Sequence, residues 1–80
     1  MLKIEDNVDL KELDKYGFVE LDNIKFYTKK VIRNAYDGID YYINIDTRII
    51  EINSNEKDEQ LDDTLYDLIK DGLVIKVEER

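Results

Sequence analysis

The chain has 80 residues, no cysteine, no histidine and a formal net charge of −8. A chain of this length is expected to fold as one domain over residues 1–80, and without cysteine it has no disulfide, thiolate metal site or thiol nucleophile. The negative charge disfavours nucleic acid and anionic membranes as direct partners and favours a basic protein surface, although acidic side chains also keep small proteins in solution.

The first predicted element is a two-turn helix over residues 9–16. Asp9 fits the N-cap position of a capping box, with Glu12 at the third helical position. Gly17 follows the helix, and glycine is the residue type that most often adopts the left-handed conformation at a helix end. These three residues therefore predict both ends of a short N-terminal helix.

An antiparallel meander of three strands is predicted over residues 24–53, after a short extended segment at 18–21. Asp37-Gly38 is a hairpin signal, because both residues tolerate the positive φ angles of a tight two-residue turn. Apolar and polar residues then alternate from 39 to 45, which is typical of a strand with one buried face. Between residues 24 and 33 the apolar side chains do not fall on a single face, so the register of the first strand stays open.

The last third of the chain predicts a longer acidic helix over residues 58–71 and a final strand over residues 73–77. Gly72 suits the end of this helix, and apolar residues recur at helical spacing on one of its sides. The residues expected on that apolar side are Leu61, Leu65, Leu68 and Ile69. The whole pattern predicts an α+β fold in which strands flank the three-stranded meander, with a short N-terminal helix and a longer acidic C-terminal helix.

The residue types present argue against an enzyme. Without histidine the chain lacks the usual general base near neutral pH and the usual zinc ligand, and its three glycines are isolated, so no phosphate-binding loop can form. Acid catalysis by paired carboxyls needs one buried carboxyl with a raised pKa, but the acids fall mostly on predicted outer faces. A magnesium site would require Asp37, Asp40 and Asp46 to converge. We therefore expect a non-enzymatic protein with no cofactor and no metal.

The outer side of the predicted 58–71 helix is the first candidate partner-binding surface. Residues three and four apart on a helix lie about 5–6 Å from each other, a spacing close to that of neighbouring phosphates in a nucleic acid. A row of acids at this spacing can occupy a groove lined with lysine and arginine, and an ordinary solvated helix face is the alternative. The row consists of Glu59, Asp63, Asp67 and Asp71, with Asp62 at its edge.

The second candidate surface lies on the predicted sheet, where tyrosine is abundant. Tyr42 falls on the polar side of its strand together with Asp40, and Tyr36 precedes the hairpin. Tyrosine in a polar rim is typical of an interface anchor. Cross-strand packing of aromatic side chains on a half-exposed sheet explains the same pattern equally well.

Three stretches of the chain resemble short phage and prophage proteins of low-GC Gram-positive bacteria. They are residues 2–13 with Tyr16-Gly17-Phe18, residues 43–50 and residues 61–69. The abundance of Ile, Asp, Asn and Lys is similar to that of such proteins. The resemblance covers nearly the whole chain and is least at 24–42. It implies a phage-type origin and, in its most concrete form, an anti-CRISPR-type inhibitor. The motifs that carry it are a helix cap, a hairpin and a helix, and they include no catalytic residue.

These observations favour a non-enzymatic phage-type protein that inhibits a host defence complex that handles nucleic acid. It is expected to act in the host cytoplasm, as a monomer or small homo-oligomer, with no membrane span. Its acids would occupy a basic groove of a nucleic-acid-binding effector while a tyrosine anchors the contact. Two alternatives remain: a phage accessory or assembly protein that binds another protein through its sheet edge, and a sponge for a small ligand such as a nucleotide signal. Added salt separates the first two, because it weakens contacts between charges and barely affects strand addition.

Overall fold

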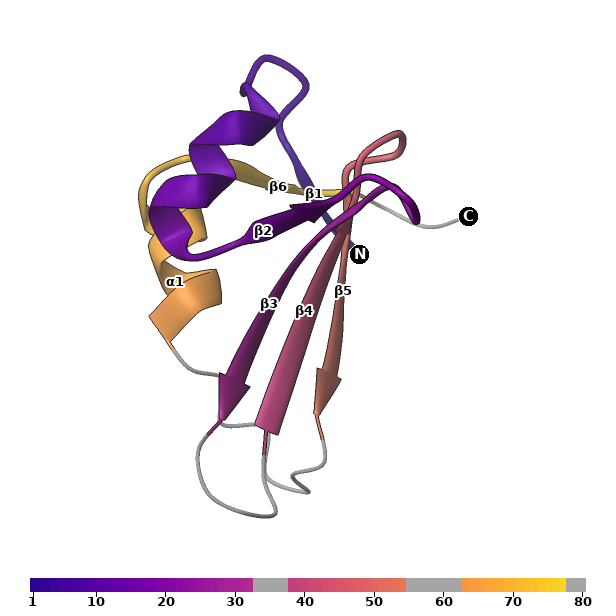
Figure 1. Cartoon of the computed structure of the whole chain (residues 1–80). Helices are drawn as coiled ribbons and strands as arrows, with labels where there is room; N and C mark the ends of the chain where they lie inside the picture. Colours follow the sequence, from indigo (N-terminus) through magenta and orange to yellow (C-terminus); the bar gives the residue numbers. More distant parts are fainter. Residues whose placement is uncertain (33–37, 55–62, 78–80) are drawn as a thin grey trace.

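A computed structural model describes residues 1–32, 38–54 and 63–77, which form an antiparallel sheet with helices on one of its faces (Figure 1). The strands are β1 (Leu2–Ile4), β2 (Val19–Leu21), β3 (Phe26–Ile32), β4 (Gly38–Asn44), β5 (Ile49–Ser54) and β6 (Val74–Lys76), and the helices are the 3₁₀ helix η1 (Leu10–Tyr16) and the α-helix α1 (Asp63–Lys70). The strand order across the sheet is β2-β3-β4-β5-β1-β6. The domain is therefore a small, sheet-rich α+β fold.

Strand β4 shows how the sequence pattern separates the two faces of the sheet. Ile39, Tyr41 and Ile43 are at most 1% exposed and form the centre of the core. Asp40 and Tyr42, which alternate with them, are half-buried. Because successive side chains of a strand point to opposite faces, the first set faces the helices and the second set faces away from them.

The structure shows which face of strand β3 is buried, a question that the sequence of residues 24–33 leaves open. Tyr27 is 3% exposed and Val31 packs against the core, so the odd-numbered residues face the helices. The predicted start of this strand at residue 24 is wrong. Ile24 and Lys25 lie in the turn that joins β2 to β3, and Lys25 has a φ of 57°, a left-handed conformation that is uncommon outside turns.

The N-terminal strand β1 is not predicted by the sequence pattern. Its three residues are too few for an alternation to be recognised, but Ile4 is fully buried and anchors the strand in the core. The strand lies between β5 and β6, with Lys3 opposite Ile49 on one side and opposite Ile75 on the other. The two ends of the described chain are thereby joined to the meander in one sheet.

The helix predicted at residues 9–16 is a 3₁₀ helix instead of two α-helical turns. The side chain of Asp9 caps its first turn by accepting a hydrogen bond from a backbone N–H. The carboxylate of Glu12 contacts Lys15 at 2.7 Å. Gly17 ends the helix in the left-handed conformation, with a φ of 89°. The ends of this element are therefore set locally, by the side chain of Asp9 at its start and the backbone conformation of Gly17 at its end.

Helix α1 covers residues 63–70 of the range predicted at 58–71, and residues 58–62 lie outside the described residues. Leu65 and Leu68 are 7% and 0% exposed, and they bury one side of the helix against the core. The expected burial of Ile69 is wrong, because its side chain is 50% exposed. The buried stripe of α1 is therefore narrower than the apolar residues of the sequence indicate.

Lys29 of β3 connects the sheet to both helices. Its ammonium group donates a 2.7 Å hydrogen bond to Oγ1 of Thr64, which is 4% exposed at the start of α1. Its aliphatic part passes beside Gly17, where an added Cβ would lie 3.3 Å from Cε of Lys29. Glycine at position 17 therefore serves both the left-handed helix end and the path of this lysine.

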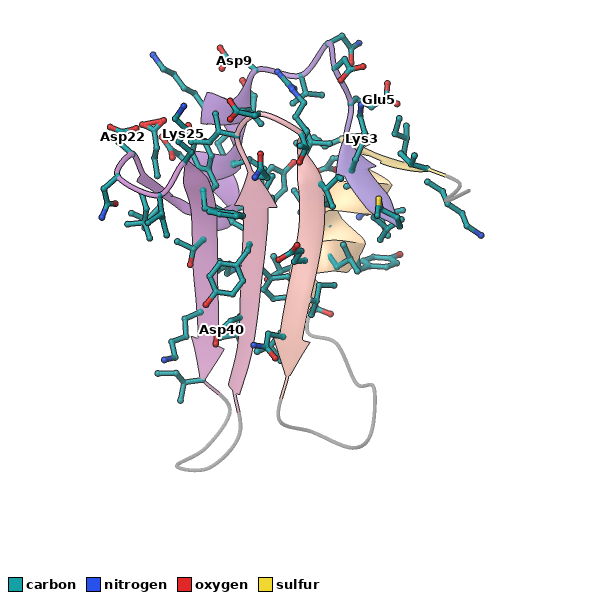
Figure 2. All side chains as sticks on the ribbon, turned by 90° about the vertical axis from the view of Figure 1, so that its right-hand side faces the viewer. Lys3, Glu5, Asp9, Asp22, Lys25 and Asp40 are labelled. Atoms are coloured by element: carbon teal, nitrogen blue, oxygen red, sulfur yellow. The ribbon has the colours of Figure 1, made fainter. Side chains whose placement is uncertain are left out.

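The face of the sheet opposite to the helices is left uncovered by the part of the chain that the structure describes. Figure 2 shows β3, β4 and β5 in front, with Asp40 on the side toward the viewer and the helices behind the sheet. We call this side the open sheet face. By strand alternation and pairing its side chains are Lys3, Val19, Leu21, Phe26, Thr28, Lys30, Ile32, Asp40, Tyr42, Asn44, Ile49, Glu51, Asn53 and Ile75.

Candidate functional site

The acids predicted on the outer side of the C-terminal helix are exposed where the structure describes them. Asp63 and Asp67 lie one turn apart on α1, and Asp71 lies in the turn that follows the helix. Glu59 and Asp62, the other members of the predicted row, lie outside the described residues. The row that can be placed in the fold therefore consists of three carboxylates.

Tyr16, the last residue of η1, joins this row to the first helix. Its hydroxyl donates a 2.5 Å hydrogen bond to Oδ2 of Asp71. This hydrogen bond, followed by burial and the charges of Asp71, Glu12 and Asp67, raises the pKa of Tyr16 to about 12. The phenol keeps its proton because a further negative charge is unfavourable beside these carboxylates. Acids from both helices therefore gather around one tyrosine.

These acids form a surface on the helical side of the domain, where η1 and α1 lie together (Figure 1). The acidic helical surface, as we call it, consists of Glu12, Asp63, Asp67 and Asp71. Two lysines adjoin it: Lys70 lies in the last turn of α1, and Lys15 contacts Glu12, which raises the pKa of Lys15. Exposed ion pairs of this kind contribute little to stability, so Lys15 does not fix the shape of the surface.

The residues of the second predicted surface lie on the other side of the sheet. Tyr42 and Asp40 belong to the open sheet face, and the Tyr42 ring packs edge-on against Phe26 with 6.2 Å between the ring centres. Tyr36 lies outside the described residues. The acids and Tyr42 are therefore two separate surfaces, and Tyr16 is the tyrosine that accompanies the acids.

Sequence reasoning missed three residues of the acidic side. Tyr66 is 64% exposed and follows Asp63 by three positions on α1, so helical spacing alone could have placed it beside the acids. Tyr16 and Glu12 gave no such signal. They join the surface only because η1 packs beside α1, and the Tyr16–Asp71 hydrogen bond links residues 55 positions apart.

The described carboxylates do not form the magnesium arrangement considered from the sequence. Asp40 lies near the start of β4, and Asp46 lies in the turn beyond its end. The strand from Asp40 to Asn44 alone spans about 13 Å at roughly 3.3 Å per residue, too far for the two carboxylates to share one ion. Asp37 lies outside the described residues. In the described ranges no three or more acids are grouped so that they could hold a metal ion.

Comparisons with family models, with curated proteins and with solved structures find no match for this chain. In the described ranges, no helix is both long enough and apolar enough to cross a membrane. The geometry and charge of the two surfaces are therefore what bear on function.

Proposed function

We propose that this domain is a non-enzymatic, phage-type inhibitor that places its acidic helical surface in a basic groove of a host protein. There it competes with nucleic acid, in the manner of an anti-CRISPR protein. The partner is a nucleic-acid-binding effector of a host defence complex, and the inhibitor acts in the host cytoplasm. The observation that supports this proposal is the gathering of carboxylates from two helices around Tyr16.

Two helices give the acidic helical surface a breadth that a single row of acids on one helix would not have. A nucleic-acid backbone presents charges at regular intervals over a broad surface. On α1, Asp63 and Asp67 are neighbours on the helix surface at about 5–6 Å, and Glu12 extends the charge onto η1. The Tyr16–Asp71 hydrogen bond ties the ends of the two helices together, so the carboxylates keep their relative positions before a partner binds. Such preorganisation lowers the entropic cost of association.

The test is capture of host proteins from a bacterial lysate on the immobilised domain, with and without excess duplex DNA. We expect a captured protein that DNA displaces and that the variant Asp63→Lys plus Asp67→Lys no longer retains. The matched control is Asp22→Lys plus Asp46→Lys, which changes the net charge equally at two exposed turn residues. Equal loss with both variants, or a partner that DNA does not displace, contradicts the proposal.

A second candidate function is a phage accessory or assembly protein that binds through the sheet edge. Strand β2 pairs with β3 only over Phe26–Thr28, so the remainder of β3 has a described neighbour only on its β4 side. An extended segment of another protein can add a strand at such an edge. Because main-chain hydrogen bonds make this contact, a captured phage protein that withstands both salt and DNA would favour this function.

A further inference from the structure

The open sheet face carries large apolar side chains that the fold does not bury. Ile32 is 72% exposed, Val19 61% and Ile75 37%, and the Phe26–Tyr42 aromatic pair on the same face is half-buried. The solvated face of an antiparallel sheet ordinarily carries polar residues. Apolar surface of this kind, rimmed by polar side chains, marks a site of interaction with another molecule.

Strand pairing places the apolar side chains at the centre of this face in two neighbouring rows. One row runs from Val19 through Thr28 and Tyr42 to Glu51, and the next runs from Leu21 through Phe26 and Asn44 to Ile49. Phe26 contacts Tyr42 from the next row. An aromatic centre with a polar rim is the composition typical of protein interfaces.

We propose that the open sheet face binds the same face of a second copy of this chain, forming a two-fold symmetric dimer. The charges favour this occupant. Within β2 to β5 the charged side chains of the face are Lys30, Asp40 and Glu51, which sum to −1, whereas the whole chain carries −8. Two equally acidic chains repel each other less when they meet through a nearly balanced face than through a strongly acidic one.

The register of the strands allows the face to pair with itself. A two-fold axis between the facing sheets, parallel to the strands and midway between β3 and β4, lays β3 of each copy over β4 of the other. Lys30 and Asp40 stand opposite each other within one sheet, so this axis places Lys30 of each copy over Asp40 of the other. The same operation places Tyr42 over Thr28. Opposite charges thus meet twice, which fixes the orientation of the copies.

The overlap is modest, so the dimer is expected to be reversible. Strands β2 to β5 lie over one another in this arrangement, a footprint of roughly 19 by 23 Å from strand spacing and length. This is less than the about 800 Å² per partner that stable complexes bury. We therefore expect a Kd of about 1–100 μM.

The first test is sedimentation equilibrium of the purified 80-residue chain between about 1 and 500 μM, a range set by that Kd. Asp40→Lys places lysines opposite Lys30 and should raise the dimer Kd at least about tenfold, because opposed like charges disfavour association. Asp46→Lys changes the net charge equally outside the face and should leave the dimer intact. The exchange Lys30→Asp plus Asp40→Lys should restore it. A chain that is monomeric throughout, or equal effects of Asp40→Lys and Asp46→Lys, would overturn the proposal.

The second test uses the absence of native cysteine. Tyr42→Cys should be joined to a second copy by a bismaleimide of about 10 Å, the distance between packed sheets, whereas Tyr66→Cys on the helical side should not. Equal cross-linking at both positions would contradict a dimer through the open sheet face. Asp63 and Asp67 belong to the acidic helical surface, on the other side of the sheet. Asp63→Lys plus Asp67→Lys should therefore leave dimerisation unchanged. Failure of the inhibitor proposal is thereby distinguishable from failure of the dimer proposal.

Discussion

Removal of the Tyr16 hydroxyl tests whether its hydrogen bond holds the two helices together. Tyr16→Phe keeps the ring and deletes the donor of the 2.5 Å bond to Asp71. A hydrogen bond to a charged group contributes roughly 1.5–3 kcal/mol, and solvent screening of the exposed Asp71 reduces this to about 1 kcal/mol. We expect a loss of that size in the free energy of unfolding, measured by urea denaturation. The control Tyr66→Phe, at an exposed position of α1, should change it by less than about 0.5 kcal/mol.

The pH dependence of the stability loss in Tyr16→Phe is a second, independent test of the Tyr16–Asp71 hydrogen bond. Folding raises the pKa of Tyr16 from 10.0 to about 12, chiefly through the hydrogen bond to Asp71. When folding raises the pKa of a group, that group stabilises the folded protein fully at any pH below its pKa in the unfolded chain. The stabilisation is lost as the pH rises through its pKa in the folded protein. The difference between wild type and Tyr16→Phe should therefore be constant from pH 7 to pH 10 and shrink toward pH 12. Equal stability of the two proteins at pH 7 would refute the role of this bond.

Two further substitutions test local features of the fold. Gly17→Ala and Gly72→Ala both place alanine at a positive φ, 89° and 79°, at a cost of about 1–2 kcal/mol each. Only at Gly17 does the new Cβ also approach Lys29, at 3.3 Å, so Gly17→Ala should lower the Tm more, and equal shifts would contradict this packing. Arg48→Met removes Nη1, which donates at 2.8 and 2.7 Å to two backbone carbonyls of the segment between β1 and η1. Urea denaturation should show a loss of about 1–3 kcal/mol, and an unchanged midpoint would rule out a stabilising role.

The parts of the fold that depend on neighbouring residues could be predicted from the sequence. Asp9 and Gly17 lie at the ends of η1 because a helix end is completed by groups within a few positions. The alternation from Ile39 to Ile43 places these residues in the core because the two faces of β4 meet different surroundings. The α+β class follows from such local patterns.

The parts that depend on distant contacts could not be predicted. Nothing in Leu2–Ile4 indicates that this strand lies between β5 and β6, because its pairing is decided by segments more than 40 residues away. Ile69 has the composition of a buried position, but the packing of α1 leaves it half exposed. The candidate site likewise has a part that local sequence predicts and a part that depends on distant contacts. Asp63 and Asp67 were recognisable from helical spacing, whereas the contribution of Tyr16 depends on the relative placement of two helices.

The central claim, that the acidic helical surface binds its partner through charge, is tested most directly by the salt dependence of affinity. The measurement is the Kd between the domain and the host protein recovered by DNA-sensitive capture, at salt concentrations from about 50 to 200 mM. We predict that the Kd rises steeply with salt for the wild type, and that Asp63→Lys plus Asp67→Lys reduces both the affinity and the slope. A Kd that is unchanged over this range, and indifferent to the two substitutions, would contradict it.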